Sequence, residues 1–360
     1  MWIEICEDIF ENGDFKSLNF LYQILSWYPS GSFERYKIFI DFEKVNKLEN
    51  YEKLKKHETD FDLLVESSFN EFITSSSSNQ KKNYYITYKK SKINFEIEEA
   101  IQFFKQPVSI ILENNKNDSA FLRAIIQHFG KANDINIAQE HLNNNWIRFE
   151  NAGGCSNMPN FIEMFLKQFE ILAIRNNRSV TDYFRGLVIL DSDKEYTNQL
   201  SKHIKLINKI TTLGIEEDNI HVLEKRMMEN YMPDEVFKEL RDLFLLNKFK
   251  NKELIDWINV YLNLRPNSTG VNEKKDFLNI NKGKLKGEIL PTTIELTNLY
   301  DLSDANFKIL NNGFKYEKKQ FKNMFPLLFI NSTLVNKHTL SIRCGTSEYD
   351  TIMNKINRLL

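Results

Sequence analysis

Residues 187–193 read Leu-Val-Ile-Leu-Asp-Ser-Asp, so an apolar run leads directly into two acids that lie two positions apart. A short, wholly apolar run bounded by polar residues is typical of a strand that is buried on both faces of a parallel sheet. In open sheets of this kind the ligand crevice lies beyond the carboxyl ends of the strands, so Asp191 and Asp193 are expected to point into it. An Asp-x-Asp pair taken alone is more often a turn and a helix cap.

The same alternation of strand and helix extends to both sides of this stretch. Apolar strands are expected over 108–113, 146–151, 186–190 and 219–225, and helical segments over 118–130, 157–174 and 195–214. Continuous apolar strands separated by helices predict an α/β fold, with a parallel sheet that helices cover on both faces. We assign this central unit to residues 106–240.

The flanking regions have different patterns. Residues 32–45 and 81–97 alternate aromatic or β-branched residues with polar ones, which predicts half-buried strands and an α+β N-terminal domain with antiparallel hairpins over 1–105. Residues 241–360 have helical spacing and carry 19 Lys and Arg against 12 Asp and Glu, a net charge of +7, whereas the first 240 residues carry −8. A mainly helical, basic C-terminal region is therefore predicted, and a phosphate-bearing partner would prefer it.

Composition narrows the class of protein. The start of the chain is acidic and interrupted by polar residues, and no apolar run approaches the length of a membrane span, so we expect a soluble, cytoplasmic protein without a membrane partner. Cys6, Cys155 and Cys344 lie far apart and lack paired spacing, which excludes a disulfide framework and a zinc motif. We expect all three to be structural. The histidines form no close ligand pair, which argues against a His metal site.

Glu113 ends the first strand of the central unit as Asp191 ends the third. If the strand order begins 2-1-3, those two strands are neighbours about 5 Å apart, and Glu113 lies beside Asp191. Carboxylates held this close repel each other, and their burial is costly unless a cation compensates. Mg²⁺ prefers carboxylate oxygens together with substrate phosphate, so Glu113, Asp191 and Asp193 are candidate metal ligands.

Three segments in this order resemble a known family: VSIILENNKNDSAFL (108–122), FENAGGCSNMPNF (149–161) and GLVILDSDKEY (186–196). They are similar to the Toprim domain of topoisomerases, bacterial primases and the OLD (overcoming lysogenization defect) nucleases. The resemblance implies that Glu113, Asp118, Asp191 and Asp193 hold metal and that Gly153 with Gly154 forms the turn after the second strand. Asn114 replaces the usual glycine, and Asp118 lies one position further on than the family pattern, which would suit a helix cap.

A fourth segment, HVLEKRMMENYMPDEVF (221–237), resembles the R-x-x-E-N-Y segment of OLD-type Toprim domains. The resemblance implies that Glu229 is a further metal ligand and that Arg226 faces phosphate; the alternative is an ordinary helix start. OLD-type nucleases also use a lysine after the Toprim core. Candidates on an expected helix around 316–325 are Lys318, Lys319 and Lys322, and Lys284 lies in a loop rich in Lys and Gly.

The leading hypothesis is a Mg²⁺- or Mn²⁺-dependent endonuclease that hydrolyses DNA or RNA, which the resemblance links to bacterial defence against phage. The chain contains no Walker A motif, so any ATP hydrolysis would belong to a separate partner protein. A homo-oligomer is possible. Two alternatives remain: a non-catalytic Toprim-like module of a larger complex, and a glycosyltransferase that holds Mn²⁺ and a nucleotide sugar at Asp191 and Asp193.

Overall fold

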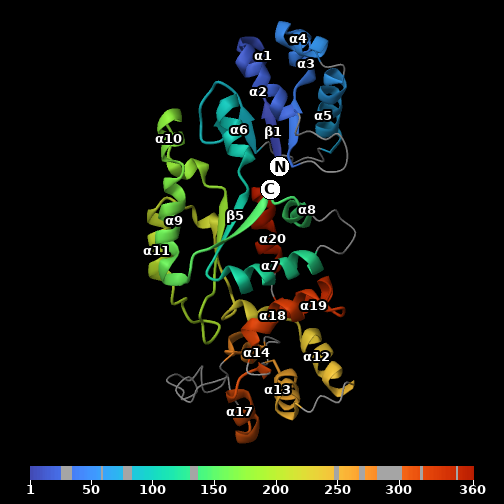
Figure 1. Cartoon of the computed structure of the whole chain (residues 1–360), viewed down its shortest axis with the longest axis vertical. Helices are drawn as coiled ribbons and strands as arrows, with labels where there is room; N and C mark the ends of the chain where they lie inside the picture. Colours follow the sequence, from blue (N-terminus) through green and yellow to red (C-terminus); the bar gives the residue numbers. More distant parts are fainter. Residues whose placement is uncertain are drawn as a thin grey trace.

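The structure is a computed structural model. It describes residues 1–25, 35–57, 60–75, 83–129, 137–246, 251–266, 272–281, 302–316, 319–345 and 348–360. Lys284 and Lys318 lie outside these ranges. The long axis of the molecule runs from an N-terminal unit, through a central sheet, to a group of C-terminal helices (Figure 1).

The central sheet has four parallel strands in the order β6-β5-β7-β8. The strands are β5 (Val108–Leu112), β6 (Ile147–Asn151), β7 (Gly186–Leu190) and β8 (Ile220–Val222). This confirms the predicted parallel sheet and the adjacency of its first and third strands. Leu112 pairs with Ile189, so β5 and β7 end at the same edge of the sheet. The residues that follow these two strands therefore emerge side by side.

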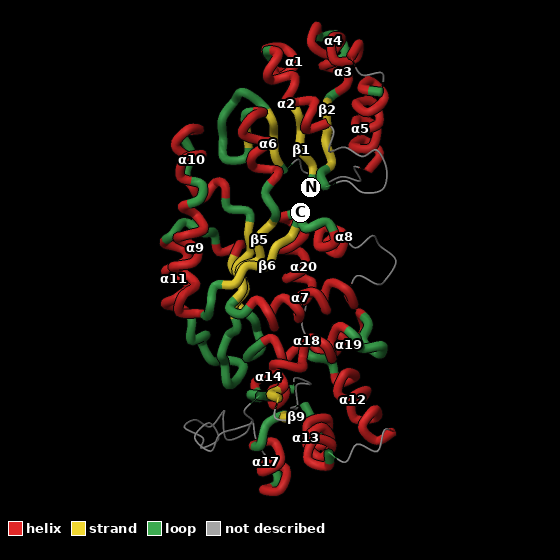
Figure 2. Tube along the Cα trace, viewed as in Figure 1, coloured by secondary structure: helices red, strands yellow, loops and turns green. Residues whose placement is uncertain are grey.

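Both faces of this sheet are buried, which explains the unbroken apolar runs. Along β7, Leu187 and Ile189 belong to one hydrophobic core, while Val188 and Leu190 belong to the core on the opposite face. Figure 2 shows the sheet between two groups of helices. One group comprises α7 (Asn115–Phe129) and α8 (Ile137–Asn143), and the other α9 (Met158–Lys167) and α11 (Ile204–Thr212). α10 (Glu170–Asn176) instead packs its buried Ala173 into the hydrophobic core of the N-terminal unit.

Gly186 opens β7 at a point where two backbones approach closely. A Cβ at this position would lie 2.8 Å from the carbonyl oxygen of Ser109 on β5 and 2.7 Å from the ring of Phe184. Because the backbone of β5 cannot retreat without disturbing the ladder, we expect Gly186→Ala to lower the free energy of unfolding by about 1–3 kcal/mol. Urea denaturation measures this loss, and an unchanged midpoint would contradict the close approach.

The N-terminal unit is a second parallel sheet, and the prediction of antiparallel hairpins was wrong. Its strands are β1 (Trp2–Ile5), β2 (Lys37–Ile40), β3 (Tyr84–Ile86) and β4 (Asn94–Phe95), in the order β2-β1-β3-β4. Each pairing is parallel. Alternation of apolar and polar residues reports half-burial but not strand direction, so the sequence pattern could not separate the two arrangements.

Helices make the long connections of the N-terminal sheet: α1 (Glu7–Asn12) and α2 (Phe15–Leu25) lead from β1 to β2, and α3 (Phe42–Val45), α4 (Glu49–His57) and α5 (Phe61–Ser75) lead from β2 to β3. A short segment without a helix, 87–93, joins β3 to β4, and α6 (Ile97–Lys105) leads from β4 to β5 of the central sheet. A hydrophobic core of its own lies within this unit. Arg185 joins the unit to both the sheet and the chain end, because its guanidinium donates to the Tyr36 hydroxyl (2.7 Å) and to the Leu359 carbonyl (2.9 Å).

The described part of the C-terminal region is mainly helical. Its elements are α12 (Asp234–Leu246), α13 (Lys252–Leu262), α14 (Glu273–Phe277), α17 (Asp304–Asn311), α18 (Phe321–Ile330), α19 (Lys337–Cys344) and α20 (Glu348–Leu359), with a short antiparallel pair β9 (Lys315–Tyr316) and β10 (Lys319–Gln320). α18 and α19 pack on α7, and α20 packs on α8 and β7. These helices share one hydrophobic core with a face of the central sheet.

Two expected helices begin later in the sequence than predicted. The helix expected over 195–214 is α11, which begins at Ile204, so residues 191–203 form a loop beyond β7. The loop is tied down by side chains, since Ser192 Oγ donates to the Lys225 carbonyl (2.6 Å) and Gln199 Oε1 accepts from the Glu195 backbone (2.5 Å). Similarly, α18 begins only at Phe321, after β10. None of the described helices has the length and apolar character needed to cross a membrane.

Candidate metal centre

Glu113 and Asp191 meet at the carboxyl edge of the central sheet. Glu113 follows β5 and Asp191 follows β7, and the backbone N–H of Asp191 donates to Glu113 Oε1 over 3.3 Å. Asp191 Oδ1 also accepts from the backbone N–H of Met228 at 3.1 Å, which fixes the carboxylate toward the segment after β8. Both acids are half-buried, so the edge that they form is still open to solvent.

Glu229 reaches the same edge from a 3₁₀ helix, η4 (Met228–Tyr231), and is buried. Its Oε1 accepts from Asn281 Nδ2 at 3.4 Å, and Asn281 Oδ1 in turn accepts from the backbone N–H of Lys322 at 2.7 Å. Lys322 lies in the first turn of α18. Asn281 thus connects the start of a C-terminal helix to the acids of the sheet, a link that no sequence motif signalled.

Asp118 lies in the first turn of α7, where its Oδ2 accepts from the backbone N–H of Asn114 at 2.8 Å. It therefore caps the helix, as the inserted residue suggested, yet it also lies within the electrostatic field of the other acids. Burial raises its pKa to about 7, and the charges of Glu229 and Glu113 contribute, while Lys322 opposes them.

Asp191 is the centre of this negative field. Its pKa is raised well above the ordinary range, first by burial and then by the charges of Glu229, Glu113, Asp118 and Asp193. Four acids therefore act on one carboxyl group: one between β5 and α7, one in the first turn of α7, one from η4 and one from the loop that carries Asp191 itself. Such a cluster destabilises the folded chain at neutral pH unless protons or a cation neutralise it.

The pKa of Asp118 predicts a gain in stability on removing its charge. A folded-state pKa of about 7 against the ordinary 3.8 means that the ionised carboxylate costs up to about 4 kcal/mol above pH 7, and that this cost fades as the pH falls toward 4. In metal-free buffer, Asp118→Asn should raise the free energy of unfolding at pH 8 but not at pH 4.5, because its amide oxygen still accepts from Asn114. Urea melts at both pH values measure this, with the exposed Asp60→Asn as control. An equal effect of the two variants at pH 8 would contradict the shift.

Asp193 occupies a different position from Asp191. It has a left-handed backbone (φ 52°), and its Oδ2 lies 3.2 Å from His203 Nε2 at the end of the loop. The hydrogen bond with His203 lowers the pKa of Asp193, and Arg226 and Lys202 add to this effect. The second acid of the Asp-x-Asp pair therefore faces an imidazole, while the first faces the other carboxylates.

Arg226 and the two glycines hold the backbone around the site in place. Arg226 is buried; its guanidinium donates to the Phe277 carbonyl (3.3 Å) and its own carbonyl accepts from the Asp193 backbone (3.0 Å). This placement suits support of the loop better than contact with phosphate. Gly153 and Gly154 adopt φ of 77° and 109°, and the N–H of Gly154 donates to the Glu113 carbonyl at 2.9 Å. The predicted turn after the second strand thus lies against Glu113.

The structure adds two residues to the site: Cys155, which the sequence analysis expected to be structural, and His203, which it did not single out. Cys155, directly after the glycine turn, donates from Sγ to Glu113 Oε2 at 2.8 Å, and its Sγ lies 3.9 Å from His203 Nε2. Burial raises the pKa of this half-buried thiol, and so do its hydrogen bond to Glu113 and the nearby carboxylates of Glu113, Asp193 and Asp191. A raised pKa disfavours the thiolate, so Cys155 is not poised as a nucleophile. Proximity of Cys155 to the glycine turn was a usable sequence signal; His203 offered none.

The lysine candidates separate by position. The charge of Lys322 acts on a site carboxylate, Asp118. Lys319 pairs with Tyr316 in the β9–β10 ladder instead of lying on a helix. Lys284 and Lys318 lie outside the described residues.

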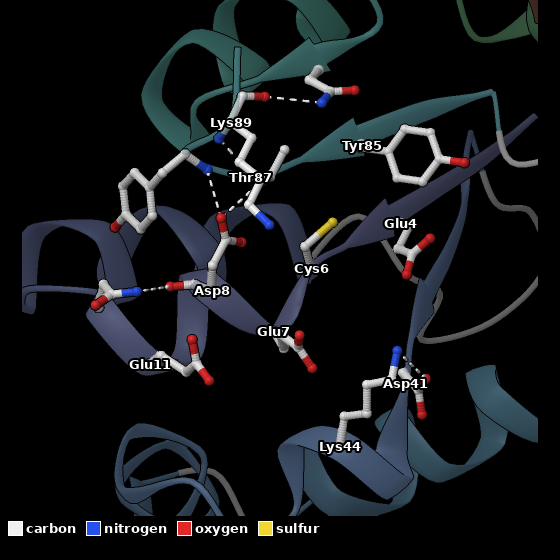
Figure 3. Close-up of a pocket in the computed structure, with 13 residues that line it drawn as sticks. Glu4, Cys6, Glu7, Asp8, Glu11, Asp41, Lys44, Tyr85, Thr87 and Lys89 are labelled. Carbon is white, nitrogen blue, oxygen red and sulfur yellow. Dashed lines mark hydrogen bonds and ion pairs between the residues drawn. The ribbon is translucent and has the colours of Figure 1, made fainter. Parts of the chain in front are cut away.

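A second acidic cleft lies at the carboxyl edge of the N-terminal sheet and has a volume of about 520 Å³ (Figure 3). Two of the acids that line it have uncharged or basic partners. Asp8 Oδ2 accepts from Thr87 Oγ1 (2.6 Å) and the Tyr88 backbone (3.0 Å), and Asp41 pairs with Lys44 (3.2 Å). Hydroxyl, amide and ammonium groups thus compensate Asp8 and Asp41, whereas the charges that act on Asp191 in the central cluster are those of other carboxylates.

Comparison of the chain with protein-family models, with curated proteins and with solved structures finds no match.

Proposed function

We propose that the protein is a Mg²⁺- or Mn²⁺-dependent phosphodiesterase that cleaves nucleic acid as an endonuclease. The observation that carries the proposal is that Glu113 accepts a hydrogen bond from the Asp191 backbone and that the charges of Glu229 and Glu113 both raise the pKa of the Asp191 carboxyl group. These three acids lie in the segments that follow β5, β7 and β8 of one parallel sheet. Acids far apart in sequence converge there without ammonium or guanidinium groups between Glu113 and Asp191 among the described contacts. The Toprim resemblance of the three segments supports the same reading.

The donor set fits a hard divalent cation. Carboxylate oxygens are the ligands that Mg²⁺ and Mn²⁺ prefer, and the raised pKa of Asp191 indicates an excess of negative charge that such an ion would neutralise. Glu113, Asp191 and Glu229 would hold it, with Asp118 at the margin. When bound, the ion would supply Lewis-acid polarisation of a phosphodiester and lower the pKa of water.

The chain itself contributes orientation and charge. Met228 and Asn281 hold Asp191 and Glu229 by hydrogen bonds, so the two carboxylates are positioned before any ligand arrives. Lys322 lies at the same edge and would offset negative charge that develops on phosphate. Half-burial of Glu113 and Asp191 leaves them accessible to a strand of DNA or RNA.

The direct test incubates the full chain with Mg²⁺ or Mn²⁺ and a panel of plasmid, linear DNA and tRNA. We expect metal-dependent cleavage of at least one substrate, blocked by chelator and by Glu113→Gln. The substrate that is cut decides between DNA and RNA. Metal-dependent thermal stabilisation is measured in parallel, because a non-catalytic module should show neither stabilisation nor cleavage. Absence of both would contradict the proposal.

The family resemblance also suggests a biological role and a partner for the protein. OLD-like nucleases are linked to defence against phage and to ATPase domains, so we propose nucleic acid as the substrate and a separate ATPase as a candidate partner. Phage plaque counts on cells that express the wild type or Glu113→Gln would test this role, and equal plaque counts would contradict it.

A further inference from the structure

We propose that Glu113, Cys155 and His203 form a binding site for a borderline transition-metal ion, with Zn²⁺ as the preferred ligand. Each residue offers one ligand atom, and the three atoms all lie within 4.8 Å of one another. This site is adjacent to the carboxylate centre but differs from it chemically, because it contains sulfur and nitrogen donors.

The three side chains come from separate elements that the sheet brings together. Glu113 follows β5, Cys155 begins the 3₁₀ helix η1 (Cys155–Asn157) after the glycine turn, and His203 directly precedes α11. Tetrahedral zinc with bonds of about 2.0–2.3 Å places its ligand atoms about 3.3–3.8 Å apart. The Sγ of Cys155 lies 2.8 Å from Glu113 Oε2 and 3.9 Å from His203 Nε2, so small side-chain shifts suffice.

The donor types select the ion. Thiolate and imidazole favour Zn²⁺ and Co²⁺ over Mg²⁺, which takes oxygen ligands. Asp193 Oδ2, 3.2 Å from His203 Nε2, is available as a fourth donor. The Cys155 thiol now donates a hydrogen bond to Glu113. On metal binding the thiol would lose this proton to solvent, and bonds from the metal to Cys155 and Glu113 would replace the hydrogen bond.

A hydrolytic triad is a poorer explanation of the same residues. In a Cys-His-Asp relay one imidazole nitrogen faces the thiol and the other faces the carboxylate. Here Cys155 and Asp193 both approach the same atom, His203 Nε2. Because Cys155 Sγ and Asp193 Oδ2 both lie near His203 Nε2, the three atoms could share a metal ion, but they cannot form a relay that uses both ring nitrogens.

Glu113 belongs to both sites, so Zn²⁺ would compete with Mg²⁺ for its carboxylate. This consequence alone rests on the proposed function. The zinc site itself depends on the geometry of Glu113, Cys155 and His203 and would exist in a protein without phosphodiesterase activity.

The test uses the full chain with Co²⁺ and Zn²⁺ in the absence of nucleic acid. We expect Co²⁺ to give a near-ultraviolet thiolate charge-transfer band that one equivalent of Zn²⁺ abolishes by displacement. Cys155→Ser and His203→Gln should each weaken Zn²⁺ binding, measured by chelator competition, by at least about 100-fold, because loss of a ligand exceeds the usual effect of losing a supporting residue.

Cys6→Ser is the matched control. Cys6 is also a half-buried cysteine among acids, in the N-terminal cleft of Figure 3, but the described residues that line that cleft include no histidine. This variant should bind Zn²⁺ as the wild type does. A cobalt spectrum without a thiolate band, or equal Zn²⁺ affinity of Cys155→Ser and Cys6→Ser, would overturn the proposal. Neither result would bear on nucleic-acid cleavage.

Discussion

Asp191→Asn should abolish metal-dependent cleavage and, at the same time, stabilise the metal-free protein. The amide keeps an oxygen that can accept from the Met228 backbone, so local folding is preserved. What it removes is the negative charge at the centre of the carboxylate cluster, whose pKa burial and the Glu229 and Glu113 charges raise. We expect at least a 100-fold loss of cleavage rate, as an order of magnitude for losing a metal ligand.

The two halves of this prediction are measured separately. Thermal unfolding without metal should show a higher Tm for Asp191→Asn than for the wild type. Mn²⁺ should raise the Tm of the wild type but not that of Asp191→Asn. Glu150→Gln, on the neighbouring strand β6, is a matched control that removes an acid from the same sheet. A lower metal-free Tm for Asp191→Asn would show that the carboxylate stabilises the fold, contrary to the electrostatic argument.

Arg343→Met should destabilise the protein by about 2–6 kcal/mol, because two buried carbonyl oxygens lose a donor at about 1–3 kcal/mol each. Arg343, on α19, is buried, and its guanidinium donates to Asp276 Oδ1 (2.6 Å), to the Met232 carbonyl (3.2 Å) and to the Asn230 carbonyl. Methionine has a similar length but no donor. Asp276 would keep Lys225 as a partner (2.8 Å), while the two carbonyls would lose this donor.

The variant also probes how the C-terminal helices support the centre, because Asn230 and Met232 closely follow Glu229 at the end of η4. Urea denaturation with Arg358→Met as control separates a buried pair from an exposed one. Arg358 pairs with Asp218 at 2.8 Å on the surface, so its loss should cost less than about 1 kcal/mol. Equal losses in the two variants would contradict the structural role assigned to Arg343.

The acids that follow the strands, Glu113 and Asp191, are the part of the site that the sequence predicted. Apolar runs at 108–112 and 186–190 identify strands buried on both faces, and parallel topology then brings Glu113 next to Asp191. The periodicity argument works here because both faces are buried. It failed for strand direction in the N-terminal sheet, since half-burial gives the same alternation in parallel and antiparallel strands.

Side-chain contacts between distant segments were beyond the sequence. Cys155 and His203 are 48 positions apart and meet only because the 191–203 segment forms a loop instead of the expected helix. Arg226 has the spacing of a phosphate-facing residue, but its backbone bonds to Asp276 and its guanidinium to Phe277 draw it inside the protein. Such outcomes depend on tertiary hydrogen bonds, which no local pattern encodes.

Anomalous scattering from a crystal of the full chain grown with Mn²⁺ tests the central claim most directly. The account predicts an anomalous peak within coordination distance of both Glu113 and Asp191 carboxylate oxygens, about 2.0–2.3 Å from each. Ordered crystals in which Mn²⁺ leaves Asp191 without contact, or in which the two carboxylates share a proton instead of an ion, would contradict it.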